Sequence, residues 1–147
     1  MGQEITWYLV GDSGRARIFY RGESDRHLQL LREFELHHSR MPKRQLVGDS
    51  LAEVQMSLKA RAQKRFMGEI AEALRQGMLR DDYENLILVA GQPFLGLLLD
   101  MMDERVQRRV KASVEKDYAY FTPPELEQQL AKQLSDFPRA LNHHPAP

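Results

Sequence analysis

Two acidic residues, Asp12 and Glu69, are the first candidates for chemistry in this chain of 147 residues. Asp12 follows an apolar stretch, and Glu69 lies in a long segment with helical periodicity. A two-metal nuclease needs several carboxylates that converge at strand ends. The third should follow the apolar run that ends at Ala90, but the next two residues carry no carboxylate. The set is incomplete, and Asp12 is equally suited to close a turn by accepting from the Gly14 amide.

Other residue types that support catalysis are missing or poorly placed. Cysteine is absent, which excludes disulfides, thiolate nucleophiles and cysteine-ligated zinc. His37 and His38 would point to opposite faces of a strand, and His143 and His144 fall in a proline-containing tail, so neither pair predicts a metal site. Residues 11–14 join two predicted strands rather than opening a helix, which favours a hairpin turn over a phosphate-binding loop. We expect no metal and no cofactor.

Basic residues are concentrated in one part of a chain whose net charge is zero. Residues 40–65 contain seven basic residues against Asp49 and Glu53. Such an excess predicts a local surface for RNA, while a solvated helix face remains the alternative. A second basic run at 105–111 is partly balanced by neighbouring acids and is the weaker candidate. The predicted RNA-binding residues are Arg40, Lys43, Arg44, Lys59, Arg61, Lys64 and Arg65, of which Arg61, Lys64 and Arg65 share one helical flank.

The first half of the chain predicts an antiparallel meander followed by a long helix. Residues 5–10 and 15–21 are rich in β-formers and flank a turn, and residues 27–36 form a third strand with imperfect alternation. Residues 39–49 are polar and predict a loop. A capping box at Ser50 and Glu53 then begins a helix that Gly77 ends.

The second half predicts two parallel strands and two helices. Residues 85–90 form a continuously apolar central strand, Pro93 starts a helix that continues to Met102, and residues 106–115 form an edge strand. A capping box from Thr122 to Glu125 begins the last helix. The expected fold is an α/β, ribonuclease H-like, three-layer domain at 1–136: a mixed five-stranded sheet, made of the meander and two parallel strands, with helices on its faces. Residues 137–147 form a flexible tail.

Several short motifs resemble the bacterial host-attachment protein family. The hairpin containing Asp12, Arg15, Ala16 and Arg17 is similar to the family's opening, and the later segment 86–126 follows its strand, its Leu-Gly helix entry at Gly96 and its Lys-Asp turn at Lys116 and Asp117. The match departs from the family at Leu97–Leu99, where an arginine is usual, and at Tyr118, where leucine is usual. The family is also similar to the middle domain of archaeal and eukaryotic class-one release factors, which implies a link to translation.

That resemblance directs attention to the pair Gly91–Gln92. Release-factor middle domains carry a Gly-Gly-Gln loop, which promotes peptidyl-tRNA hydrolysis, between the meander and the long helix. Here the corresponding interval, 39–49, has no glycine pair and no Gly-Gln. Gly91–Gln92 lies one helix later, where Gly91 allows a strand-to-helix turn. The sequence therefore does not favour an enzyme.

The leading hypothesis is a non-enzymatic cytosolic module that contacts the ribosome or RNA through the loop at 40–49 and the basic helix flank. The N-terminus lacks a basic leader and a spanning segment, so a cytoplasmic location without a membrane span is expected. The alternative is a protein-protein interaction factor linked to attachment to host cells, which predicts an exposed apolar patch or an unpaired sheet edge. The oligomeric state is left open.

Overall fold

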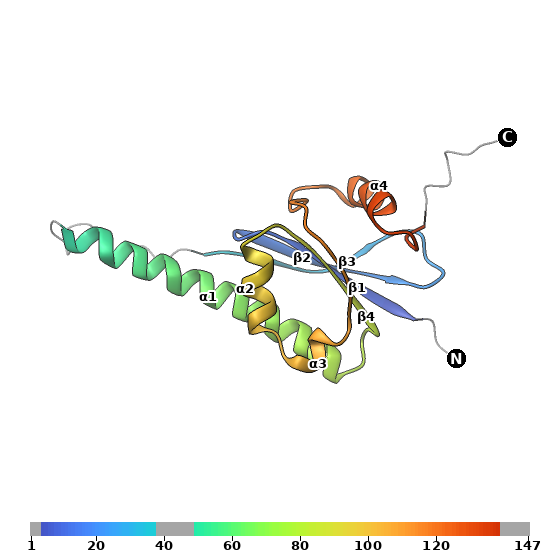
Figure 1. The fold of residues 1–147 in the computed structure, drawn as a ribbon, viewed down its shortest axis with the longest axis horizontal. Helices are drawn as coiled ribbons and strands as arrows, with labels where there is room; N and C mark the ends of the chain where they lie inside the picture. Colours follow the sequence, from blue (N-terminus) through green and yellow to red (C-terminus); the bar gives the residue numbers. More distant parts are fainter. Residues whose placement is uncertain (1–3, 38–48, 139–147) are drawn as a thin grey trace.

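Five strands form one mixed sheet in the order β3-β2-β1-β4-β5 (Figure 1). The computed structural model describes residues 4–37 and 49–138, with residues 49–51 described by their backbone only. Within the sheet, β2 is antiparallel to both its neighbours, whereas β1, β4 and β5 run parallel. This topology confirms the expected α/β, ribonuclease H-like layout. The strands are β1 (Ile5–Gly11), β2 (Arg15–Gly22), β3 (Gln29–Glu35), β4 (Asn85–Ala90) and β5 (Val110–Val114).

Helices cover both faces of the sheet and give three layers. Successive strand residues point to opposite faces, so Trp7 and Leu9 join the core beneath α1, α2 and α3, while Tyr8 and Val10 join the core beneath α4. β4 is buried on both faces, as its continuous apolar sequence predicts. The helices are α1 (Asp49–Leu79), α2 (Phe94–Met101), α3 (Glu104–Gln107) and α4 (Pro123–Gln133).

The turn between β1 and β2 is closed by Asp12. Its Oδ1 accepts from the backbone N–H groups of Gly14, at 2.8 Å, and Arg15, at 2.9 Å. Before the turn, Gly11 lies directly opposite Ala16, and a Cβ at Gly11 would lie 2.7 Å from the Ala16 Cβ. The turn-forming role predicted for Asp12 is confirmed, and glycine at position 11 permits the close approach of the two strands.

A β-bulge explains the imperfect alternation of β3. Ile18 pairs with Arg32 and Phe19 with Leu30, so Leu31 has no partner opposite it on β2. An extra residue in one strand shifts the alternation of the side chains that follow it. The period-two pattern in the sequence is interrupted for this reason, and the strand is shorter than the predicted 27–36.

Asp81, rather than Gly77, ends α1. The Asp81 backbone is left-handed, with φ 57°. Its N–H donates to the Met78 carbonyl at 3.0 Å, and the N–H of Asp82 donates to the Gly77 carbonyl at 2.8 Å. This pair of bonds is a Schellman ending. At its other end the helix is described from Asp49, so Ser50 lies inside the helix and not at its cap.

The predicted last strand, 106–115, was too long at its start. Residues up to Gln107 form the short helix α3, and the strand begins only at Val110. The helix forms because the Asp103 side chain caps it by accepting from the Arg105 N–H, at 2.8 Å, while Val106 is buried in the core. Polar residues around a single buried valine gave the sequence no clear strand or helix period.

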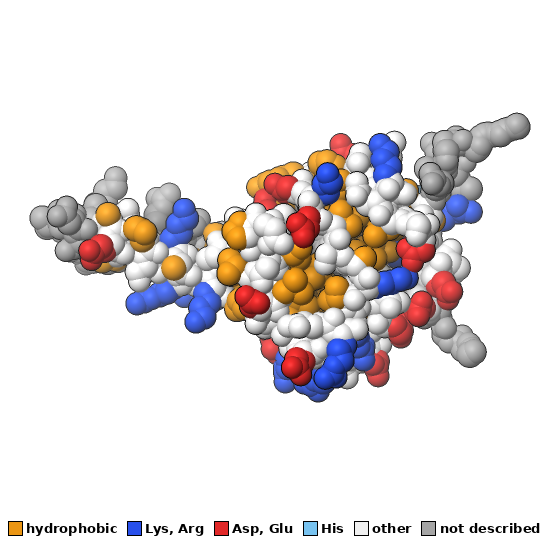
Figure 2. Space-filling model, viewed as in Figure 1, with side chains coloured by type: hydrophobic (Ala, Val, Ile, Leu, Met, Phe, Trp, Pro, Cys, Tyr) orange, Lys and Arg blue, Asp and Glu red, His pale blue; other side chains and the backbone are white. Residues whose placement is uncertain are grey.

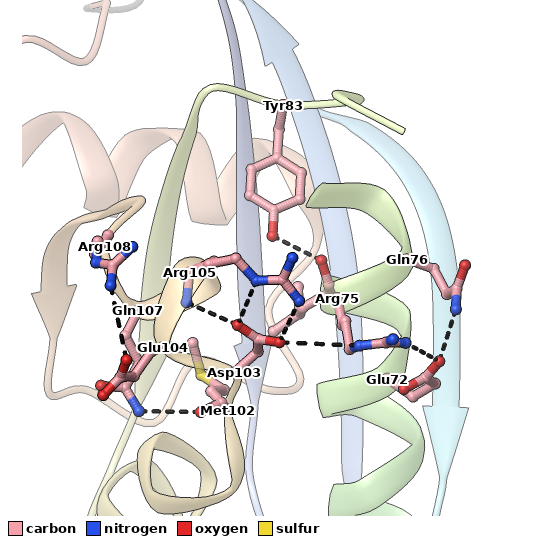
Figure 3. A network of polar contacts seen from close by, with 11 residues as sticks. Glu72, Arg75, Gln76, Tyr83, Met102, Asp103, Glu104, Arg105, Gln107 and Arg108 are labelled. Carbon is pink, nitrogen blue, oxygen red and sulfur yellow. Dashed lines mark hydrogen bonds and ion pairs between the residues drawn. The ribbon is translucent and has the colours of Figure 1, made fainter. Parts of the chain in front are cut away.

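A polar network fastens α1 to this short helix (Figure 3). Asp103 accepts from the Arg105 guanidinium at 2.9 Å and lies 3.9 Å from Arg75 Nε of α1. Arg75 also pairs with Glu72 at 3.0 Å, and Glu72 accepts from Gln76 at 2.7 Å. The network therefore couples one exposed face of α1 to the turn between α2 and α3.

Acid is expected to weaken this network through Asp103. Hydrogen bonds from Arg105 lower the pKa of Asp103 from 3.8 to about 2. Because the folded-state pKa is below the unfolded value, the stabilisation is complete above about pH 4 and is lost as the pH falls through about 2. Urea unfolding between pH 2 and 6 should show the Asp103→Asn variant destabilised at pH 6 and approaching the wild type at pH 2. A constant difference across that range would contradict the assignment.

The last helix begins as the sequence predicts. The Thr122 hydroxyl accepts from the Glu125 N–H at 3.3 Å, and the Glu125 carboxylate accepts from the Thr122 N–H at 2.8 Å, which confirms the capping box. Beyond it, Phe137 is buried and makes an edge-on contact with Tyr8 at 5.8 Å. The packed region therefore includes Phe137, which the sequence assigned to the tail. The remainder of that predicted tail, from residue 139, lies outside the described residues.

No helix within the described ranges is long and apolar enough to cross a membrane.

Candidate nucleic-acid interface

The first part of α1 extends beyond the sheet (Figure 1). From Ala52 to Arg61 no side chain is buried, and Val54 and Leu58 of the predicted apolar stripe are only half-buried. The first buried side chains of the helix are those of Ala62 and Phe66, with the exposed Lys64 and Arg65 between them. At 1.5 Å per residue, the ten residues 52–61, none of them buried, form a rod of roughly 15 Å. The helix thus holds its N-terminal residues away from the body of the domain.

This projecting part of α1, residues 52–65, carries four exposed cations, Lys59, Arg61, Lys64 and Arg65. Figure 2 shows Lys and Arg side chains on this helix. Helix geometry of about 100° per residue places Arg61, Lys64 and Arg65 within about 100° of arc, whereas Lys59 lies about 140° from Lys64. The structure therefore supports a flank of three residues, with Lys59 on a different side.

The two basic runs differ in how their charges are compensated. In the second run, Arg105 pairs with Asp103, Arg108 with Glu104, Arg109 with Asp81 and Lys111 with Asp136. None of the four cations on the projecting part of α1 forms an ion pair with another described residue. The sequence ranked the second run lower from its neighbouring acids, but Asp81 and Asp136 are distant in the chain and could not have been assigned as partners.

Arg40, Lys43 and Arg44 lie outside the described residues. Their contribution to the same surface stays a prediction. They precede α1 in the chain.

A hollow of about 500 Å³ lies at the carboxyl ends of β1 and β4. It is lined by Asp12, Gln63, Gln92 and Asp117, among others. Glu69, the second acid of the nuclease hypothesis, instead lines a separate hollow with Arg65. Among the described residues there is no group of three or more His, Asp or Glu that could hold a metal ion. Asp117, which the sequence identified only as a motif residue, also lines this hollow.

The pair Gly91–Gln92 serves the entry to α2. The Gln92 side-chain Oε1 accepts from the Gly96 N–H at 3.1 Å, and the Gly91 carbonyl accepts from the Leu95 N–H at 3.0 Å. The position after β4 is as expected, but Pro93 is the N-cap and not the first helical residue. A Cβ at Gly91 would meet nothing within 4 Å, so the turn does not require glycine there, contrary to the sequence interpretation.

Two arginines of the family motif on β2, Arg15 and Arg17, contact the segment that follows β5. Arg17 is 7% exposed, and its guanidinium donates to the carbonyls of Tyr118, at 3.3 Å, and Ala119, at 2.9 Å. Burial lowers the pKa of Arg17, with Arg15 contributing further. The Arg15 guanidinium lies 4.6 Å from the centre of the exposed Tyr120 ring. The motif arginines therefore act in packing this connection, a role that the sequence pattern alone did not reveal.

The remaining motif residues and the histidines occupy different parts of the fold. Lys116 and Asp117 are exposed, and Ala16 packs in the core beneath α1. His37 is exposed, while its partner His38 and the pair at 143 and 144 lie outside the described residues. His27 lies 3.1 Å from Glu127 on α4. Neither His27 nor His37 lines the hollow that contains Asp12 and Asp117.

The chain belongs to the host-attachment family, because the family model described as "Protein required for attachment to host cells" matches residues 7–130. This confirms the resemblance seen in the hairpin and in the later motifs. A comparison with curated proteins gives no match.

Solved structures with the same fold include release factors. An archaeal protein aligns with TM-score 0.52 and 11% identity, over 90% of this chain and 35% of its own. The archaeal translation termination factor aRF1 aligns with TM-score 0.54 and 11% identity, over 90% of this chain and 36% of its own. The chain thus spans about a third of the length of these structures. At this identity the likeness shows the fold, and it confirms the similarity to release factors.

Proposed function

We propose that the chain is a non-enzymatic cytoplasmic module that binds RNA, and ribosomal RNA in particular, through the projecting part of α1. Arg61, Lys64 and Arg65 supply the contacts, and Arg40, Lys43 and Arg44 extend them. The observation that carries the proposal is the exposed charge of this helix, whose cations form no ion pair with a described residue, whereas every cation of the second run is paired. Exposed cations that form no ion pair with the described residues are available to neutralise phosphates and release their counterions.

The chemistry of the projecting helix favours phosphate contacts over base recognition. Residues 52–65 contain no aromatic side chain, and the next residue, Phe66, is buried. Sequence-tolerant binding to single strands uses exposed aromatic rings on which bases stack. Structured RNA, whose phosphates are regularly spaced, is therefore the class of partner proposed. The fold shared with a translation termination factor adds support for a partner in the translation machinery.

Charge reversal of the helix flank is expected to weaken binding to purified ribosomes tenfold or more at about 50 mM salt, with a smaller difference at higher salt. The variant is Arg61→Glu, Lys64→Glu and Arg65→Glu together. All three side chains are exposed, so the fold should be unaffected. Filter binding or co-sedimentation over a salt series measures the effect.

A matched control carries the same change of charge elsewhere. Arg26, Arg108 and Lys132 are exposed and lie outside α1. Changing these three to glutamate should leave binding within about threefold of the wild type. Equal weakening by the two triple variants would show that only net charge matters, and unchanged binding by the α1 variant would exclude the proposal.

The competing function is a protein-protein interaction linked to attachment to host cells. β3 is the outer strand of the described sheet, and its Leu30 is 50% exposed, as this alternative predicts. The family description favours it as well. A pull-down with the full chain separates the two: recovery of ribosomal components alone counts against this alternative, and recovery of one non-ribosomal protein that survives nuclease treatment counts for it.

A further inference from the structure

An apolar hollow of about 580 Å³ opens on the α1 side of the sheet, over β1 and β2. Trp7 and Ile18 of these strands line it, and Tyr20 and Leu31 stand beside them. The residue that α1 presents here is Ala73, which is too small to fill the space between helix and sheet. The hollow exists because the helix approaches the sheet without a large side chain at this point.

The hollow leaves apolar surface in contact with water. Of the side chains that line it, Leu31 is 47% exposed and Tyr20 is 36% exposed. Its volume is within the range of about 300–1,000 Å³ that small-molecule sites occupy. An apolar ligand bound here would remove these side chains from water, and the hydrophobic effect would contribute favourable free energy to binding.

One cation at this hollow forms no ion pair within the described part of the chain. Arg80 pairs with Asp82 at 3.0 Å, so both of those charges are compensated. The Arg32 guanidinium lies 4.6 Å from the centre of the Phe34 ring and forms no ion pair with any other described residue. The hollow thus presents a single unpaired positive charge beside an apolar surface.

We propose that this hollow binds an amphipathic monocarboxylate, with its apolar chain against Trp7, Tyr20 and Leu31 and its carboxylate beside Arg32. An uncharged ligand would leave Arg32 without a partner. An ammonium ligand would face the guanidinium and be repelled. The complementary class is therefore a medium-chain or aromatic acid, and this site is independent of the RNA-binding helix flank.

Trp7 reports on the hollow directly, because it is the only tryptophan of the chain. Titration of the intact protein with octanoate, octanol and octylamine, each below its aggregation threshold, compares one apolar chain with three head groups. Octanoate should change Trp7 fluorescence saturably. Octanol should bind about three- to fivefold more weakly, the size of an exposed ion pair, and octylamine more weakly still.

Two variants test the residues. Arg32→Gln should bring octanoate down to the affinity of octanol, while Arg26→Gln, an exposed arginine outside the hollow, should change nothing. Leu31→Asn should weaken all three probes together. Equal binding of octanoate and octanol, or no effect of Arg32→Gln, overturns the proposal. A dimer in sedimentation that octanoate fails to dissociate, with no fluorescence response, also overturns it, since a second copy would then occupy the hollow.

Discussion

Replacing Gly77 with alanine is expected to destabilise the protein by about 2 kcal/mol, because overpacking costs up to about 3 kcal/mol and helix propensity returns about 1. A Cβ at Gly77 would lie 2.4 Å from Trp7 Cη2 and 2.6 Å from Cζ3. Trp7 is buried, and its indole makes a tilted contact with the Tyr83 ring at 4.5 Å between centroids, so the added Cβ would meet a packed ring. Urea unfolding followed by circular dichroism measures the loss.

Gly68 provides the control in the same helix. A Cβ there would lie 3.7 Å from Met101 Cε, which is ordinary van der Waals contact. Gly68→Ala should therefore stabilise the protein by up to about 1 kcal/mol through helix propensity alone. If the two variants changed stability in the same direction, the close packing of α1 on Trp7 would be wrong.

Arg17→Ala is expected to lower the free energy of unfolding by about 2 to 3 kcal/mol, because it removes the donor to a buried carbonyl and leaves that carbonyl unsatisfied. The Ala119 carbonyl accepts from Arg17 at 2.9 Å, whereas the Tyr118 carbonyl also accepts from the Phe121 N–H at 3.1 Å. The loss should be accompanied by faster amide exchange in residues 116–121, which a loss of packing elsewhere would not produce. Arg17→Met should recover part of the stability, by restoring packing, but not the exchange protection.

Arg15→Ala is the comparison for this change. Arg15 is two residues away and contacts the same connection, but it only stacks on the ring of Tyr120, which is 69% exposed. An exposed cation–π contact is worth about 0.5–1 kcal/mol. If Arg15→Ala lowered the free energy of unfolding as much as Arg17→Ala, the buried hydrogen bonds of Arg17 could not be the cause of its effect on stability.

Most of the fold could be predicted because local patterns and tertiary structure agree. The apolar run of β4, the turn at Asp12 and the capping box at Thr122 are each decided by neighbouring residues, and the structure has them in place. The predictions were wrong where contacts between residues far apart in the sequence determine the structure. Gly77 is the residue type that typically ends a helix. Here, however, its lack of a side chain leaves room for the indole of Trp7, some 70 positions earlier in the chain.

The candidate site was predictable in its charges but not in its geometry. Sequence identified the cations of α1, since their excess is a property of the chain alone. It could not show that burial begins only at Ala62, because the apolar stripe continues through Val54 and Leu58 with the same spacing. Nor could it distinguish the two basic runs fully, because the partner of Lys111 is Asp136, which follows α4 in the chain.

The projecting part of α1 makes this electrically neutral molecule a dipole. Residues 52–65 hold four basic residues and one acidic residue, a net charge of +3, so the rest of the chain carries −3 to reach the total of zero. Without a net charge, the protein gains no long-range attraction to a polyanion. It is instead turned helix-first on approach, within about 10 Å of the surface at 0.1 M salt. The separation of charge therefore selects the orientation of encounter before any contact forms.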